Sequence, residues 1–178
     1  SFLKNKNSFF IPNPSDISFE TLNNFNKSCN VDVFFALSHG VHRGILKTGK
    51  IDDRITFLKK LQEKTQNIKF DIYGIDKVQP IWADHYFKTI ENAKMGLNLS
   101  RGEAIKYYSS DRITQIIGNG LVCLIDEKTQ YNNFFNSKEM VFYKNLSDLS
   151  EKIMKVANDE KLRKSIGRQG KLKYMKYF

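Results

Sequence analysis

Tyr107-Tyr-Ser-Ser-Asp-Arg-Ile-Thr-Gln-Ile-Ile-Gly-Asn-Gly-Leu-Val-Cys-Leu-Ile-Asp126 is the stretch that predicts the fold. Residues 109–111 are of the types that begin helices, and three isoleucines follow at helical spacing. A Gly turn and the apolar run Leu121 to Ile125 then predict that a buried strand follows this short helix. Unpaired backbone N–H groups at the start of the helix favour an anion, so the stretch predicts a phosphate site.

The same alternation of strand and helix runs along most of the chain. Strands are predicted at Val31–Leu37, Ile68–Gly74, Met95–Leu99, Leu121–Ile125 and, at a sheet edge, Met140–Tyr143. Apolar residues at helical spacing begin near Ile51, cover His85–Ala93 and resume at Leu146. This order is typical of an α/β, Rossmann-like, doubly wound parallel sheet that binds ligands at the carboxyl ends of its strands.

Length and composition predict a single domain. With 178 residues, of which 40% are hydrophobic, the chain can bury one sizeable core and is too short for two full α/β domains. Residues 1–30 lack a clear periodicity and contain prolines at positions 12 and 14, which resist helix formation. We therefore expect a connector over 1–30 and the domain over 31–178.

Several classes of protein are disfavoured. Two cysteines do not make a disulfide framework, and no apolar run approaches the roughly 18 residues of a membrane span or resembles a signal peptide. We expect a soluble, cytoplasmic protein, or one peripheral at the inner face of a membrane. The net charge of +10 comes from scattered lysines, so it indicates a bound phosphate compound as readily as nucleic acid. The glycine patterns of NAD-binding, P-loop and hydrolase sites are absent.

The loop from Ser38 to Lys50 follows the first predicted strand and is rich in glycine and basic residues. Gly40 permits close backbone approach, and Arg43 and Lys47 could neutralise a diphosphate. The alternative is a solvated basic loop. His39, directly at the strand end, is a candidate for a hydrogen bond to substrate. No set of carboxylates or cysteines surrounds it, so no metal site is predicted.

Two further strand ends carry candidate residues. Gly74 ends the second strand and could accept a planar base against the backbone, although a plain tight turn is the alternative. Ser109 and Ser110 supply amides at the start of the short helix, where Arg112 and Gln115 can face the ligand.

The chain resembles the C-terminal, donor-binding half of a GT-B glycosyltransferase, of the group related to spore-coat glycosyltransferase-like proteins and group 1 glycosyl transferases. Phe10-Ile-Pro-Asn-Pro-Ser-Asp16 resembles the segment that crosses into the second domain. Asn92 to Ser100 is similar to the strand before the donor loop, and Tyr108 to Gly120 is similar to the donor-binding helix and its turn. Leu149 to Gly170 resembles the closing helices.

The resemblance implies roles for some residues and departs at others. Relatives commonly hold the donor ribose with a glutamate where this chain has Gln115, and the acidic residue eight positions earlier falls on Tyr107, so stereochemistry is left open. Their basic pair for the diphosphate maps onto Arg43 and Lys47. No Asp-x-Asp is present, as expected of a metal-independent fold family without a further cofactor.

The resemblance predicts a hexosyltransferase-like enzyme that moves a sugar from a nucleotide-diphospho-sugar to an unknown glycan, lipid or protein acceptor. Because the chain begins at the apparent crossover, we expect an acceptor domain N-terminal to it and little activity from this fragment alone. The alternatives are a non-catalytic nucleotide- or phosphate-binding α/β module and a basic protein that binds nucleic acid non-specifically.

Overall fold

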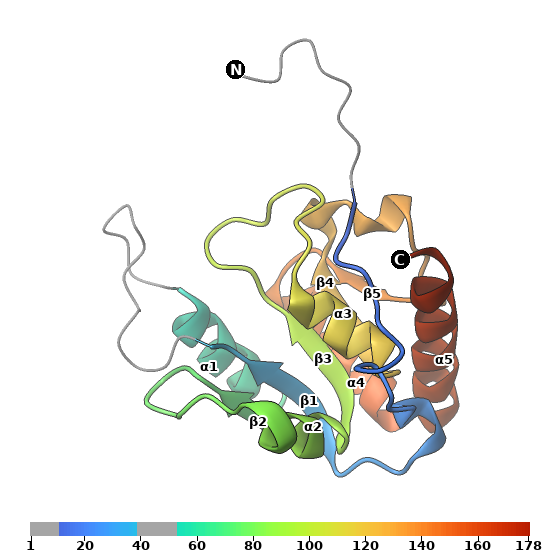
Figure 1. The fold of residues 1–178 in the computed structure, drawn as a ribbon. Helices are drawn as coiled ribbons and strands as arrows, with labels where there is room; N and C mark the ends of the chain where they lie inside the picture. Colours follow the sequence, from blue (N-terminus) through green and yellow to red (C-terminus); the bar gives the residue numbers. More distant parts are fainter. Residues whose placement is uncertain (1–10, 39–52) are drawn as a thin grey trace, which may run out of the picture.

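Five parallel strands form one sheet in the order β2-β1-β3-β4-β5 (Figure 1). The computed structural model describes residues 11–38 and 53–178. The strands are β1 (Val31–Ala36), β2 (Phe70–Tyr73), β3 (Ala93–Asn98), β4 (Val122–Asp126) and β5 (Val141–Tyr143). The predicted α/β, Rossmann-like sheet is therefore confirmed, with β5 at an edge as expected.

Helices cover both faces of the sheet. The helices are α1 (Arg54–Lys64), α2 (Ala83–Ile90), α3 (Asp111–Gly118), α4 (Leu146–Asn158) and α5 (Glu160–Tyr177). One core lies between the sheet and α1 with α4, and the other between the sheet and α2 with α3. Side chains alternate along β1, so that Phe35 enters the first core and Phe34 the second. Helix α5 reaches both cores at the side of the domain, through Ile166 and Tyr174.

The connections change direction between β1 and β3. From β1 the chain passes through α1 to β2 on one side, whereas β3 leads through α3 to β4 on the other. Neighbouring parallel strands whose connections leave toward opposite faces open a crevice at their carboxyl ends, and ligands of such sheets bind there. A ligand site is therefore expected at the carboxyl ends of β1 and β3.

One predicted helix boundary is wrong. Helix α2 runs from Ala83 to Ile90, and Ala93 opens β3 by pairing with Val31 of β1. Ala93 continues the helical spacing by chance, because a buried alanine fits the start of an inner strand equally well. Strand β2 is shorter than predicted. Its four residues are all half-buried, as suits an edge strand.

Residues 11–30 lie against α3 and α5. Tyr174 Oη donates to the Asn13 carbonyl at 2.7 Å. Arg163 of α5 is almost fully buried and donates to the carbonyls of Asn24 and Lys27, each at 2.8 Å. These contacts satisfy backbone groups that would otherwise be buried without partners. That the segment connects two domains stays a prediction.

No helix in the described part of the chain is long and apolar enough to cross a membrane. The two cysteines, Cys29 and Cys123, are free and buried.

Helix α3 packs on β3 where that strand has no side chain. A Cβ atom built on Gly96 would lie 2.4 Å from Cγ1 of Ile116. Ile116 is fully buried in the second core, so it has little room to move away. The glycine therefore sets how closely α3 approaches the sheet.

We expect Gly96→Ala to lower the free energy of unfolding by about 1–3 kcal/mol, because the methyl group overpacks the contact with Ile116. Urea unfolding of the parent and variant measures the change. Ile116→Ala alone leaves a cavity and costs about 2–5 kcal/mol. The double variant should lose less free energy of unfolding than the sum of the two single losses, since the added methyl group occupies part of that cavity. Strict additivity would contradict the proposed contact.

Candidate functional site

The first turn of α3 lies at the carboxyl end of β3. Ser110 is its N-cap and has extended backbone angles, φ −150° and ψ 153°. Its hydroxyl makes no capping bond to the helix and instead lies 3.5 Å from Oδ1 of Asn98. The amides at the start of α3 thus lack a side-chain cap, which leaves them available to an anion.

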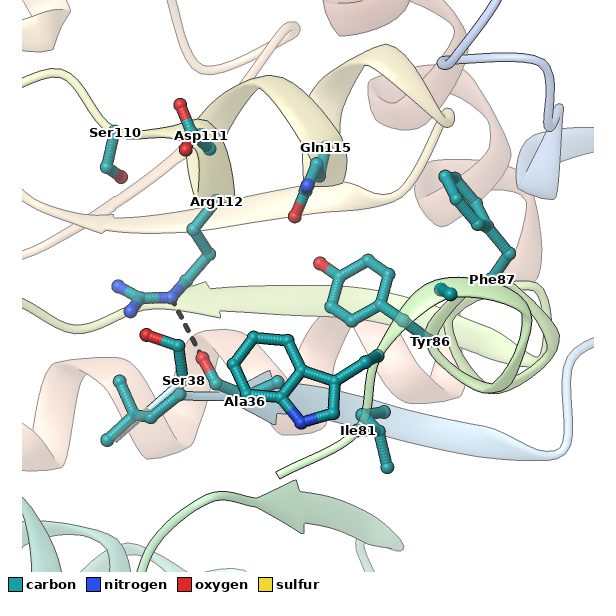
Figure 2. Close-up of a pocket in the computed structure, with 12 residues that line it drawn as sticks. Ala36, Ser38, Ile81, Tyr86, Phe87, Ser110, Asp111, Arg112 and Gln115 are labelled. Atoms are coloured by element: carbon teal, nitrogen blue, oxygen red, sulfur yellow. Dashed lines mark hydrogen bonds between the residues drawn. The ribbon is translucent and has the colours of Figure 1, made fainter. Parts of the chain in front are cut away.

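Arg112 joins the ends of the two central strands. Its Nε donates to the Ala36 carbonyl at 3.3 Å (Figure 2). Its Nη1 donates to the Leu99 carbonyl at 3.3 Å and to Asn98 Oδ1 at 3.4 Å. The guanidinium also lies over the ring of Phe35, 5.3 Å from its centroid. Burial, followed by the positive charge of Arg54, lowers the pKa of Arg112. An arginine side chain remains protonated in proteins, so a fixed positive charge lies beside the start of α3.

A cavity of about 370 Å³ opens at this place (Figure 2). It is lined by the end of β1 (residues 36–38), by the start of α2 and the residues before it (81–83, 86 and 87), and by the start of α3 (110–112 and 115). Its size lies within the range of small-ligand sites, which is about 300–1,000 Å³. The cavity coincides with the crevice that the sheet topology predicts.

Two polar side chains enter the cavity from facing helices. Figure 2 shows the Gln115 amide extending from α3 and the Tyr86 hydroxyl extending from α2 into the space between them. Desolvation raises the pKa of Tyr86 well above its ordinary value, so the phenol stays protonated at neutral pH. A phenol and a primary amide can each donate and accept hydrogen bonds. The pair is suited to hydroxyl groups of a ligand.

A carboxylate also borders the cavity. Asp111, the first residue of α3, lines it and accepts a hydrogen bond from Nδ2 of Asn13. Its negative charge stabilises the helix start, while it opposes a second anion nearby. Among the described residues, no cluster of three or more metal-binding side chains occurs.

The predicted site residues fall into three groups. Ser38, Ser110, Arg112 and Gln115 line the cavity together. Ser109 and Gly74 are not among its lining residues. His39, Gly40, Arg43 and Lys47 lie outside the described residues.

Ser109 and Gly74 have other contacts. Ser109 Oγ accepts from the Asn13 amide at 2.7 Å and so faces residues 11–16. Gly74 has φ +75°, and a Cβ atom there would lie 1.9 Å from the Leu37 carbonyl oxygen. The turn after β2 therefore requires glycine for its own geometry.

Trp82 and Tyr86 are among the cavity residues that were not predicted from the sequence. The helical spacing placed the start of α2 at His85, whereas the helix begins at Ala83. One signal was available in the sequence: Trp82 is the only tryptophan of the chain and lies in the connection after the second strand.

Comparison with known proteins agrees with this fold. The model of the glycosyl transferase-like family matches residues 54–178. A search of curated protein sequences finds no match. A crystal structure of TarM matches with a TM-score of 0.59 and 15% identity, over 96% of this chain and 35% of that one. A variant of S. aureus TarM, in complex with fondaparinux, alpha-GlcNAc-glycerol and UDP, matches with a TM-score of 0.59 and 12% identity, over 85% of this chain and 34% of that one.

The chain spans about a third of the length of these two structures. At such low identity the likeness shows the fold alone, and that fold is the predicted GT-B type. The family model covers well over half of the sequence. This chain therefore belongs to the glycosyl transferase-like family.

Proposed function

We propose that this domain binds the donor of a glycosyltransferase, a nucleoside-diphospho-sugar, in the cavity between the ends of β1 and β3. The observation that carries the proposal is the uncapped start of α3 beside that cavity, with Gln115 one to two turns further along. Anions bind at helix N-termini, and the polar groups of a sugar bind to side-chain amides. The complex of TarM with UDP supports a nucleotide as the ligand class.

In this proposal the diphosphate lies at the start of α3. The amides of Asp111 and Arg112 are proposed to donate to phosphate oxygens, since the Ile113 amide already donates to the Ser110 carbonyl. Arg43 and Lys47, which lie outside the described residues, are proposed to bind the same oxygens. Arg112 acts differently, since its Nε and Nη1 are already directed to carbonyl and amide oxygens of the strand ends. It contributes a fixed positive charge that partly offsets the carboxylate of Asp111.

The chemical contribution of these groups is stabilisation of the leaving group. When the bond between the sugar and the diphosphate breaks, negative charge grows on the departing phosphate oxygen. Donors and cations already oriented toward that oxygen bind the transition state more strongly than the ground state, which lowers the barrier. No residue of the described cavity is assigned as a base, and the acceptor and its activation are proposed to involve the rest of a longer enzyme.

A thermal-shift screen with UDP-, GDP-, ADP-, CMP- and dTDP-sugars tests the proposal, because a ligand that binds only the folded state raises the melting temperature. At least one should raise it, and the free nucleotide of that compound should do so as well. If none of these compounds binds, the assignment of the cavity to a donor is wrong.

Arg43→Ala should weaken the binding of the nucleoside diphosphate by about 1.5–3 kcal/mol, the usual contribution of a charge-assisted hydrogen bond. Isothermal titration calorimetry measures the affinity. Arg168→Ala is the matched control, because Arg168 is exposed on α5, outside the cavity. If both variants lose the same affinity, only the overall charge of the protein affects binding, and the assignment of Arg43 to the diphosphate is wrong.

Gln115→Leu should weaken binding by about 1–2 kcal/mol, because ribose hydroxyls would lose their partner inside the cavity. Gln115→Glu should retain more affinity than Gln115→Leu, since a carboxylate still accepts hydrogen bonds from the ribose. Gln169→Leu, on the exposed side of α5, provides the control. The ribose assignment fails if titration finds Gln115→Leu as tight as the parent protein.

A further inference from the structure

Trp82 presents an unpaired indole at the cavity. The side chain lines the cavity, yet the residue is 60% exposed. Within residues 11–38 and 53–178, no ring contact, hydrogen bond or cation–π contact of the indole is found. A large aromatic side chain gains stability by burial, so an indole left open beside a cavity is available to a flat ligand.

The backbone holds Trp82 in place. Its carbonyl accepts from the amides of His85 at 3.1 Å and Tyr86 at 3.3 Å, in the first turn of α2. The next residue, Ala83, has φ +47°, a left-handed conformation that alanine rarely adopts. The chain thus turns sharply from an extended residue into the helix directly after Trp82. Strained backbone of this kind persists where the surrounding structure fixes it and is concentrated at ligand sites.

The cavity changes character along its length. Figure 2 shows Ser110 and the Arg112 guanidinium toward one end, Gln115 and the Tyr86 hydroxyl in the middle, and Ile81 and Phe87 toward the other end. Gln115 is five residues beyond Ser110, which is roughly 7–8 Å along a helix axis. The order is charged, then polar, then apolar and aromatic. A nucleotide has the same order of groups in its phosphates, ribose and base.

We propose that Trp82 is the stacking platform for the nucleobase of the donor. This inference rests on the proposed function, because it assigns a residue of the same cavity to the base of the proposed donor. Every base has a π-face, so stacking on the indole contributes affinity for all four common bases rather than selecting one. Trp82 is therefore a binding residue for the base, while the phosphates and ribose are held from α3.

Calorimetric titration of the parent protein, Trp82→Ala and Trp82→Phe with UDP and with ADP tests the proposal. Trp82→Ala should lose about 5- to 150-fold in affinity for both nucleotides, which corresponds to stacking of one base, and Trp82→Phe should lose less. Tyr177→Ala, which removes an equally exposed aromatic at the end of α5, should match the parent protein. Pyrophosphate and ribose 5-phosphate, which have no base, should bind the parent and Trp82→Ala equally.

The outcomes separate the two proposals. If the parent binds UDP or ADP and Trp82→Ala binds it equally well, the stacking role is overturned while donor binding stands. An equal loss for pyrophosphate and for nucleotides would also overturn it, because the substitution would then disturb the whole cavity. If the parent binds neither nucleotide nor pyrophosphate, both proposals fail. Since Trp82 is the only tryptophan, quenching of its fluorescence by UDP in the parent protein is a second expected result, and an unchanged signal at saturation would contradict stacking.

Discussion

The close contact between β3 and α3 at Gly96 determines the geometry of the site. Because β3 has no side chain there, Ile116 lies directly on the strand and α3 stays close to the sheet along its length. Arg112, in the first turn of that helix, donates to the carbonyls of Ala36 and Leu99. Those bonds add a side-chain link between the ends of β1 and β3, which already pair along the sheet.

Sheet topology explains where the cavity lies, and the side chains at the strand ends and at the start of α3 determine which groups line it. A parallel sheet directs its strand carbonyls and the N-termini of the following helices to the same edge, so positive helix ends and carbonyl oxygens meet there. In this chain Arg112 satisfies some of the carbonyls, while the Ser110 hydroxyl is turned to Asn98 instead of capping α3. The proposed anion site is therefore the start of α3, which has no side-chain cap and borders a cavity lined by both polar and apolar residues.

Much of this could be predicted from the sequence, and the exceptions have physical reasons. The spacing of the isoleucines after Ser110 predicted α3, and Gln115 was identified as a residue of that helix. A helix that buries one face has apolar residues at regular spacing, and this pattern is easy to detect in the sequence. The start of α2 was misplaced because the left-handed turn at Ala83 has no residue signature, and Trp82 was missed with it. Tyr86 lay within the predicted helix but was not recognised as a cavity residue, because helical spacing does not show which residues face a ligand. The partners of Arg112 are mostly backbone carbonyls, which leave no trace in the sequence.

The glutamine at position 115 is consistent with the charges around it. Asp111 lies four residues earlier on the same helix, so the two side chains are neighbours on one face. A glutamate at 115 would place a second carboxylate beside Asp111 and near the proposed diphosphate, and like charges at this spacing are unfavourable. Glutamine still offers an acceptor and a donor to ribose hydroxyls without that repulsion. Exchange of this glutamine for glutamate would thus change the charge of the cavity, whereas exchange for leucine would remove its capacity for hydrogen bonds.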